Sequence, residues 1–516
     1  MILNALLALL SAALLVLLFP PYSLPWLAPL ALAPLMIACA REDRWRFRFA
    51  LGCAAGFVYW FGLTHWIHQT LTHYAGIGSA GSWALFVLMC LAKSLQTGLF
   101  AALCGPLFLS WMALPATAAL WVAIEYTHAW TGFEWLNLGN AGSDMAVPLR
   151  LAAVTGVWGL SFVFALMSAG IACALLRRPR LHLAWLLVLP ALYLLPDIPP
   201  PERGDASAIV VQPNIDADTL WSPEMKARTL EQLHSVSLSP VLARNGPVDL
   251  IIWPEMPAPF YSEDALFTGA VADVAKAAGA SVLTGVVARA TDGGPLNSAL
   301  LTGPDGRVVS RYDKVNLVPF GEFVPWPLAS LTKKVSSEAG DFEAGRDVVV
   351  SRVAGHRIGT FICYESVFPG YIRRFAASGA EVLVNISNDG WYGKSPARDQ
   401  HLQIVRMRAA ENQRWILRAT NNGVTAVIDP AGRLIRAAKE YEELGARFPF
   451  RYRAGQSFYT RFGDWFVALC GLLSIAGIVT ALRKTGTGAN FAALAKLRAC
   501  PPFAQRRSEL TTDERN

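Results

Sequence analysis

The sequence predicts a polytopic α-helical membrane domain joined to a layered α/β domain. Of its 516 residues, 53% are hydrophobic and only 16% are charged, whereas about 25% of the residues of an ordinary soluble domain are charged. Long apolar runs fill positions 1–197 and return near 464–482, and the stretch between them alternates short β-type runs with helical patterns. These features exclude a purely cytosolic enzyme and a disordered chain.

About eight apolar runs are long enough to be membrane spans. They cover residues 3–19, 24–40, 50–68, 82–102, 105–127, 150–176, 182–197 and 464–482. We expect the first to be an uncleaved helix, because no positive residue precedes it and it ends at Pro20-Pro21. The predicted division is a membrane domain of seven transmembrane helices over 1–197, an exported catalytic domain over 198–460, an eighth transmembrane helix over 461–483 and a disordered cytoplasmic tail over 484–516.

The positions of Lys and Arg predict the orientation of these spans. Basic clusters follow the second, sixth and eighth spans, at Arg41, Arg44, Arg46 and Arg48, at Arg177, Arg178 and Arg180, and at Arg483 and Lys484, whereas loops 69–81 and 128–149 carry neither residue type. Because Lys and Arg near span ends stay in the cytoplasm, eight spans place 198–460 outside the cytoplasmic membrane, which is the periplasmic side of the inner membrane if the source is a Gram-negative bacterium. The net charge of +7 therefore reflects membrane topology, and we expect no nucleic-acid partner.

Residues 198–460 predict a layered α/β fold. Strands are expected at 208–212, 248–253, 281–287, 298–302, 307–312, 357–363, 381–386, 415–420, 424–428 and 434–435, and helices at 223–244, 263–279, 369–379 and 398–413. The hairpin-like segments 299–309 and 426–435 resemble each other, which suggests two similar halves, although hairpins are common enough for coincidence.

Three of these strands end at residues that could carry chemistry. Strand 248–253 leads to Glu255, which is placed like a general base, and strand 307–312 leads to Lys314, which could stabilise an oxyanion. Glu322 could hold the Lys314 ammonium. Taken singly, each of these residues is more often an exposed loop residue, so the interpretation depends on their combination.

Cys363 ends the third strand and is the only thiol in the polar stretch. Six other cysteines fall in apolar runs and the eighth, Cys500, lies in the tail. A thiolate is a strong nucleophile, and a carboxylate such as Glu365 could remove its proton, although a buried inert cysteine is the common alternative. The loop after the next strand, 385–393, carries Trp391 and could form a pocket wall.

Glu255, Lys314 and Cys363, in this order at three strand ends, resemble the Glu-Lys-Cys triad of the carbon–nitrogen hydrolase (nitrilase) superfamily over residues 205–455. Segments 312–325 (YDKVNLVPFGEFVP) and 362–365 (ICYE), together with the eight spans, resemble the apolipoprotein N-acyltransferase branch of that superfamily. The resemblance implies an α-β-β-α sandwich. It also implies transfer of an acyl chain from a phospholipid to the α-amine of an S-diacylglyceryl-cysteine, which completes lipoprotein maturation.

The resemblance further implies a ping-pong mechanism with a thioester on Cys363, in which Glu255 is the base and Lys314 stabilises the oxyanion. The implied partners are a phospholipid donor such as phosphatidylethanolamine, a diacylglyceryl-prolipoprotein acceptor and the membrane. Supporting residues carried over from the family are Glu322, Tyr364 and Glu365, and substrate-binding residues are Trp221, Asn297 and Trp391. Aromatic residues that could dip into lipid are Phe260, Tyr261, Trp326, Phe342, Trp391 and Tyr392.

No metal or cofactor is expected, because the only histidine cluster, His65, His68 and His73, lies at the outer end of a span, and no phosphate loop occurs. Lys93 lies inside the fourth apolar run, where contact with a lipid phosphate competes with a structural role, either snorkelling or packing against a carbonyl. Glu125 and Glu134 are possible partners. Two alternatives remain open: a membrane-tethered amidase or nitrilase acting on a small soluble substrate, and a transporter or receptor whose outer domain only binds.

Overall fold

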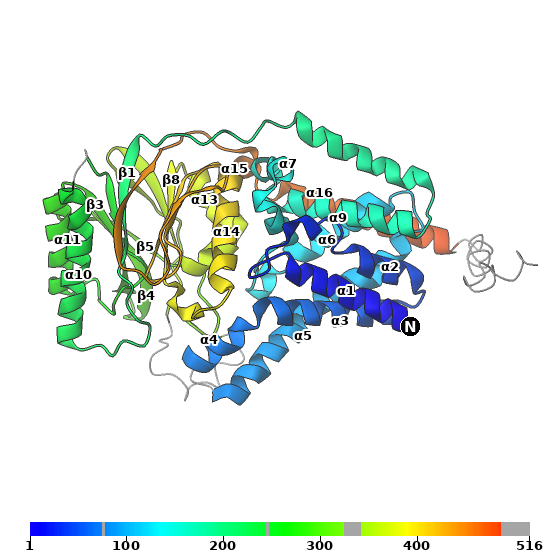
Figure 1. Cartoon of the computed structure of the whole chain (residues 1–516), viewed down its shortest axis with the longest axis horizontal. Coiled ribbons are helices and arrows are strands. Elements are labelled where there is room, and N and C mark those ends of the chain that lie inside the picture. Colours follow the sequence, from blue (N-terminus) through cyan, green and yellow to red (C-terminus); the bar gives the residue numbers. More distant parts are fainter. Residues whose placement is uncertain (75–77, 244–246, 325–341, 487–516) are drawn as a thin grey trace, which may run out of the picture.

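The computed structural model describes residues 1–74, 78–243, 247–324 and 342–486. It consists of a helical half and a sandwich of two β-sheets between layers of helices, which lie next to each other along the long axis (Figure 1). The chain begins in the helical half, passes through the sandwich and returns to the helical half with α16 (Trp465–Gly486). The sandwich confirms the fold predicted for the polar stretch.

Two six-stranded sheets form the centre of the sandwich. The first has the order β12 (Leu444–Phe450), β1 (Ala206–Gln212), β2 (Leu250–Ile252), β3 (Ser281–Arg289), β4 (Pro295–Thr302), β5 (Val308–Asp313). The second has the order β11 (Leu434–Ala437), β10 (Ala426–Ile428), β9 (Ile416–Thr420), β8 (Val382–Ser387), β7 (His356–Ile362), β6 (Val350–Val353).

The two sheets repeat one pattern of strand directions. In the first, β1, β2 and β3 are parallel and the β4–β5 hairpin adds two antiparallel strands. In the second, β7, β8 and β9 are parallel and the β10–β11 hairpin follows in the same way. The two hairpins are the segments whose sequences resemble each other, so the structure agrees with the interpretation of two similar halves.

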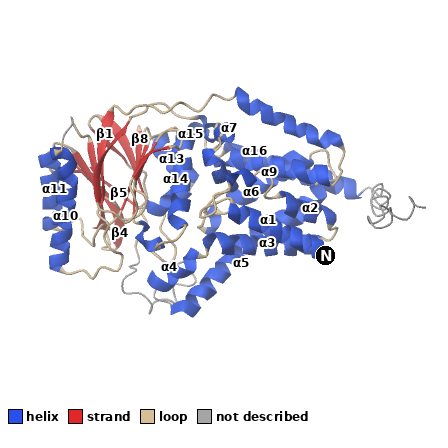
Figure 2. Cartoon of the chain, in the orientation of Figure 1, coloured by secondary structure: helices blue, strands red, loops and turns tan. Residues whose placement is uncertain are grey.

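Helices cover the outer face of each sheet (Figure 2). The first sheet carries α10 (Pro223–Leu242) and α11 (Ala265–Ala278), and the second carries α13 (Pro369–Ala377) and α14 (Ala397–Asn412). Alternation along β1 explains this layering, because successive strand residues point to opposite faces. Ala208 and Val210 belong to the core shared with the second sheet, whereas Ile209 and Val211 pack with residues of α10 and α11.

All ten predicted strands are present, but the sequence analysis missed β6 and β12. The sequence of β12, Leu-Gly-Ala-Arg-Phe-Pro-Phe, contains a glycine and a proline, which are typical of turns. A proline cannot donate to a sheet ladder and is therefore found on edge strands. β12 is the edge strand of the first sheet, and its Pro449 lies opposite Ser207 of β1.

The helical half is built from apolar helices packed on one another. In chain order they are α1 (Ile2–Leu17), α2 (Ala33–Arg41), α3 (Trp45–Thr64), α4 (Trp66–Tyr74), α5 (Gly78–Leu107), α6 (Ala113–Tyr126), α7 (Ala146–Leu149), α8 (Ala152–Thr155), α9 (Val157–Leu175) and a helix of 3-10 type, η4 (Arg180–Leu194), with α15 (Phe458–Phe462) and α16 closing the chain. Among the described residues, four helices are long and apolar enough to cross a membrane, namely α3, α5, α9 and α16.

Several predicted spans contain shorter helices than the apolar runs suggested. The run 24–40 contains only a 3-10 turn and the nine-residue α2, because Pro25, Pro29 and Pro34 interrupt its hydrogen bonding. The run 150–176 is divided at Gly156, whose φ of +67° ends α8 before α9 begins. The number of spans and the orientation of the chain therefore stay predictions.

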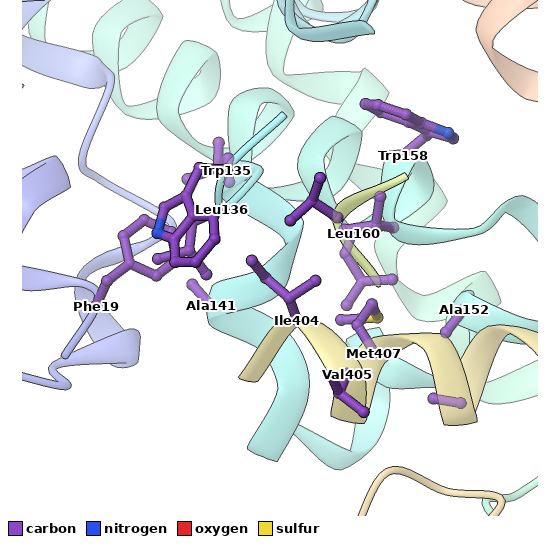
Figure 3. Close-up of a cluster of buried hydrophobic side chains, with 14 of the residues drawn as sticks. Phe19, Trp135, Leu136, Ala141, Ala152, Trp158, Leu160, Ile404, Val405 and Met407 are labelled. Carbon is purple, nitrogen blue, oxygen red and sulfur yellow. The ribbon is translucent and has the colours of Figure 1, made fainter. Parts of the chain in front are cut away.

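α14 joins the two halves through one continuous hydrophobic core. Figure 3 draws part of this cluster, in which Ile404 and Met407 of α14 lie with Leu160 of α9 and with Trp135. Polar contacts also hold α14 in a defined orientation on the helical half. The Gln400 Oε1 accepts hydrogen bonds from the indole nitrogens of Trp66 at 3.2 Å and Trp135 at 2.8 Å. The sandwich is thus fixed on the helical half, and the residues after β7 lie close to this junction.

Candidate active site

The three predicted catalytic residues meet between the two sheets. β2 and β5 run in the same direction within the first sheet, so Glu255 and Lys314 follow their carboxyl ends at the same edge. Cys363 follows the end of β7 in the second sheet. All three side chains are buried, with exposed fractions of 3% for Glu255, 1% for Lys314 and 5% for Cys363.

Lys314 is held between two carboxylates. Its Nζ lies 3.2 Å from Oε1 of Glu255 and 2.8 Å from Oε1 of Glu322. Burial opposes its positive charge, but the two carboxylates outweigh that effect, so the pKa of Lys314 lies above its ordinary value. The lysine therefore carries a permanent positive charge at the centre of the site.

Asn297 of β4 fixes the two carboxylates relative to each other. Its Nδ2 donates at 2.7 Å to Oε1 of Glu255 and at 2.7 Å to Oε1 of Glu322. The backbone N–H of Asn388, at the end of β8, donates to the other Glu255 oxygen at 2.9 Å. Asn297 thus contacts both carboxylates, and its predicted contact with substrate stays a prediction.

Cys363 adopts a backbone conformation that is rare for a residue with a side chain. Its φ is +50°, in the left-handed region where most residues are strained. It begins a short 3-10 helix, η5 (Cys363–Val367). Burial raises the pKa of the Cys363 thiol, the charge of Glu255 adds to the rise, and Lys314 opposes it. At neutral pH the sulfur thus carries its proton, and a base would have to remove it for the sulfur to act as a nucleophile.

Glu365 fastens the turn that carries Cys363. Its carboxylate accepts hydrogen bonds from the backbone N–H groups of Ile362 and Val315, both at 2.8 Å, and from that of Asn316 at 3.1 Å. The Tyr312 hydroxyl also donates to it at 2.6 Å. Glu365 therefore connects the end of β7 with the segment that carries Lys314, which gives the predicted supporting residue a structural role.

We predict that Glu365 makes stability depend on pH. Burial raises the pKa of its carboxyl from 4.5 to about 7, so the folded protein binds this proton more tightly than the unfolded chain does. Its contribution to stability is complete below pH 4.5 and is lost as the pH rises through about 7. Thermal unfolding of the wild type and of Glu365→Gln across this range should show a flatter pH dependence for the variant. Equal slopes would contradict the prediction.

A buried ionic network lies behind the nucleophile. The Arg418 Nη2 donates to both oxygens of Asp389, at 2.7 and 2.9 Å, and all of these atoms belong to fully buried side chains. Burial opposes ionisation of Asp389, but Arg418 and His401 outweigh it and hold the pKa of its carboxyl well below the usual range. The sequence analysis missed this network, because Asp389 lies in what reads as a simple Asn-Asp-Gly turn.

His401 links this network to Cys363. Its Nδ1 lies 3.2 Å from the Arg418 Nη2, and its Nε2 lies 3.2 Å from the carbonyl oxygen of Cys363. The same Nδ1 lies 3.3 Å from Oδ1 of Asp389, and Nε2 lies 2.8 Å from the Ser366 hydroxyl. Burial, with the charge of Arg418, lowers the pKa of His401, which agrees with a neutral ring. The network thus extends from Asp389 and Arg418 to the backbone of Cys363.

Sequence similarity to known proteins covers both halves of the chain. A model of the Carbon-nitrogen hydrolase family matches residues 208–446, and one of the Apolipoprotein N-acyltransferase N-terminal domain matches residues 11–170. An Apolipoprotein N-acyltransferase of Geobacter metallireducens is 33% identical over 92% of this chain and 94% of its own. The chain belongs to the apolipoprotein N-acyltransferase family.

Other members of this family are similar over most of their length. The protein of the same name from Azotobacter vinelandii is 34% identical over 90% of this chain and 92% of its own, and that from Nitrosomonas europaea is 33% identical over 86% and 92%. Among solved structures, an amidase from Nesterenkonia sp. is 16% identical, covers 52% of this chain and 97% of its own, and has a TM-score of 0.37. Membership of an acyltransferase family identifies the chain as an enzyme.

The remaining residues predicted from the family lie in different places. Tyr364 is buried, and its hydroxyl donates at 2.6 Å to the carbonyl of Gly132 in the helical half. Trp391 is 42% exposed, and its carbonyl accepts a hydrogen bond from Thr70 of α4 at 3.2 Å. Trp221 packs against the hydrophobic cluster under α10 and α11, and its contact with substrate stays a prediction.

The prediction that loop aromatics face lipid is wrong for Phe260. This residue is 1% exposed and its ring stacks on Phe267 of α11 at a centroid distance of 4.8 Å. Tyr261 is 37% exposed, and its contact with lipid stays a prediction, as does that of the exposed Trp391. Phe342 and Tyr392 are partly buried, and Trp326 lies outside the described residues.

Proposed function

We propose that the chain transfers an acyl chain from a phospholipid to the amino group of an S-diacylglyceryl-cysteine through a thioester on Cys363. The observation that carries this proposal is the buried cluster of Glu255, Lys314 and Cys363, in a chain of the apolipoprotein N-acyltransferase family. The cluster contains a nucleophile, a base and a fixed positive charge, which are the parts that acyl transfer needs.

In the first half of the reaction, Glu255 takes the proton of the Cys363 thiol as the sulfur attacks the ester carbonyl carbon of the phospholipid. Lys314 has three donors, and two of them are directed at Glu255 and Glu322. The third would stabilise the oxyanion of the tetrahedral intermediate. The ester C–O bond then breaks, the leaving alkoxide takes the proton from Glu255, and a thioester and a lysophospholipid result.

In the second half, the amino group of the acceptor attacks the thioester carbonyl and Glu255 takes a proton from the nitrogen. The C–S bond breaks, Glu255 gives the proton from the nitrogen to the leaving sulfur, and an amide remains on the acceptor. Water would compete with the amine for the thioester, so the site has to exclude it. The 5% exposure of Cys363 at the junction of the two halves supports such exclusion.

The setting we propose is the bacterial cytoplasmic (inner) membrane, with the sandwich on its periplasmic side. The apolar helices α3, α5, α9 and α16 support insertion in a membrane. The basic clusters after the second, sixth and eighth predicted spans support the orientation. We propose phosphatidylethanolamine as donor and a diacylglyceryl-prolipoprotein as acceptor, since both would reach the site from the lipid phase.

Intact mass spectrometry of the purified full-length protein tests this proposal. After incubation with phosphatidylethanolamine, we expect a mass gain of one acyl chain that a diacylglyceryl-cysteine peptide removes and water does not. Cys363→Ala should lose the adduct completely, and Cys470→Ala, which removes another buried thiol in α16, should keep it. An unmodified wild type that instead hydrolyses small amides would favour the membrane-tethered amidase.

A further inference from the structure

Lys93 is a charged residue buried in the middle of α5. Only 2% of its surface is exposed, and a charge in a membrane-spanning helix is costly unless it has partners. The structure supplies them: Nζ donates to Thr131 Oγ1 at 2.8 Å, to the carbonyl of His128 at 3.4 Å and to the carbonyl of Phe133. All three ammonium donors are therefore used on one short segment of the chain.

This segment, residues 128–133, follows α6 and is called here the junction loop. It contains a single 3-10 turn, Ala129–Thr131, and then Gly132 with a φ of +70°. Lys93 also lies over the rings of Trp60, at 5.0 Å, and Phe133, at 5.7 Å, within the range of a cation–π interaction. The junction loop has little regular secondary structure, and the contacts with Lys93 help to hold it in place.

The opposite side of the junction loop carries the residue next to the nucleophile. The Tyr364 hydroxyl donates at 2.6 Å to the carbonyl of Gly132, and the Tyr364 ring stacks with that of Phe133 at a centroid distance of 6.5 Å. Tyr364 is 3% exposed. Any displacement of the loop must therefore move Tyr364, and with it the strained backbone of Cys363.

We propose that Lys93 is a positioning residue that acts on Cys363 through the junction loop and Tyr364. The kinetic test of this inference rests on the proposed function. The inference goes beyond that function because it gives the membrane-embedded helix α5 a part in placing the nucleophile. It also decides between the two interpretations of Lys93 that the sequence left open: the ammonium binds protein carbonyls and a hydroxyl.

A double-mutant cycle between Lys93→Met and Tyr364→Phe tests the proposal in the full-length protein. The measurement is the single-turnover rate of thioester formation with phosphatidylethanolamine at saturating lipid. We expect each variant to be about tenfold slower and the double variant to be no slower than the slower single one, because both remove the same link. Lys93→Arg keeps the charge and hydrogen-bond donors, so it should lose less of the rate than Lys93→Met. Rate losses that multiply in the double variant would overturn the proposal.

Gln96→Met provides the matched control. Gln96 is three residues from Lys93 in α5 and donates at 2.8 Å to Thr127, which precedes the junction loop. This variant should form the thioester at the wild-type rate. A loss equal to that of Lys93→Met would mean that any polar deletion in α5 slows the enzyme, and the specific role of Lys93 would be wrong.

Hydrogen exchange supplies a readout that needs no acyl transfer. In Lys93→Met, peptides covering 128–135 and 363–368 should both exchange faster than in the wild type and in Gln96→Met. Faster exchange in the first peptide alone would break the proposed link to Cys363. A wild type that forms no acyl adduct would refute the proposed function, while the exchange result would still decide the role of Lys93. If Lys93→Met does not fold, Thr131→Val removes one of the three acceptors and should show the same pattern with about a threefold slower rate.

Discussion

Glu255→Gln should lower the rate of thioester formation by roughly 10²–10⁴-fold, the range expected when a general base is lost. The amide has nearly the shape of the carboxylate, so the hydrogen bond from Asn297, at 2.7 Å in the wild type, can still be made. What disappears is the ability to take the proton of the Cys363 thiol, whose raised pKa makes a base necessary. Single-turnover acylation, followed by intact mass spectrometry, measures the effect.

Glu322→Gln is the matched control for this prediction. Both carboxylates contact Lys314 and Asn297, but Oε2 of Glu322 accepts from the backbone N–H of Val318 within its own loop, at 2.8 Å. We expect this variant to acylate clearly faster than Glu255→Gln. The reverse order would assign the role of base to Glu322.

Arg418→Met should destabilise the sandwich by about 3–5 kcal/mol, the usual cost of removing one partner of a buried ion pair. The change leaves the Asp389 carboxylate, which is fully buried, with only Ser387 and His401 as side-chain partners. For a domain of this size the loss corresponds to a decrease of about 10 °C or more in the unfolding midpoint. Thermal unfolding of the purified protein measures the shift.

Arg289→Met makes the same chemical change on the surface. Its pair with Glu263 has side-chain exposures of 53% and 54%, and exposed pairs contribute about 0–1 kcal/mol. The midpoint of this variant should therefore stay within a few degrees of the wild type. If both variants shift the midpoint equally, the buried network is not a main source of stability. A second consequence is specific to Arg418: its loss removes a contact of His401, which lies against the carbonyl of Cys363, and should also slow acylation by Cys363.

The three reactive residues could be found from the sequence because each stands directly after a strand. The run 248–253 is recognisable as a buried strand from its apolar residues, and the residues that follow its end lie at the edge of a sheet. The lone thiol Cys363 was found in the same way. Local pattern cannot give the contacts of Asn297, since its two carboxylate partners are 42 and 25 positions away.

In the helical half, the sequence alone predicted less of the structure than it did in the sandwich. Hydropathy located every apolar run, but it could not show that prolines divide the run 24–40 or that Gly156 divides the run 150–176. Hydropathy reports burial in an apolar medium and is insensitive to whether the backbone hydrogen bonds are continuous.

By itself, the sequence determined the two-part architecture and ten of the twelve strands of the sandwich, and it predicted the triad of Glu255, Lys314 and Cys363. Only the tertiary structure decided how these parts act on one another: His401 against the carbonyl of Cys363, Tyr364 against Gly132, and Lys93 under the junction loop. The physical reason is that periodicity encodes which face of an element is buried. The partner that covers this face is chosen by the packing of elements that lie far apart in the chain.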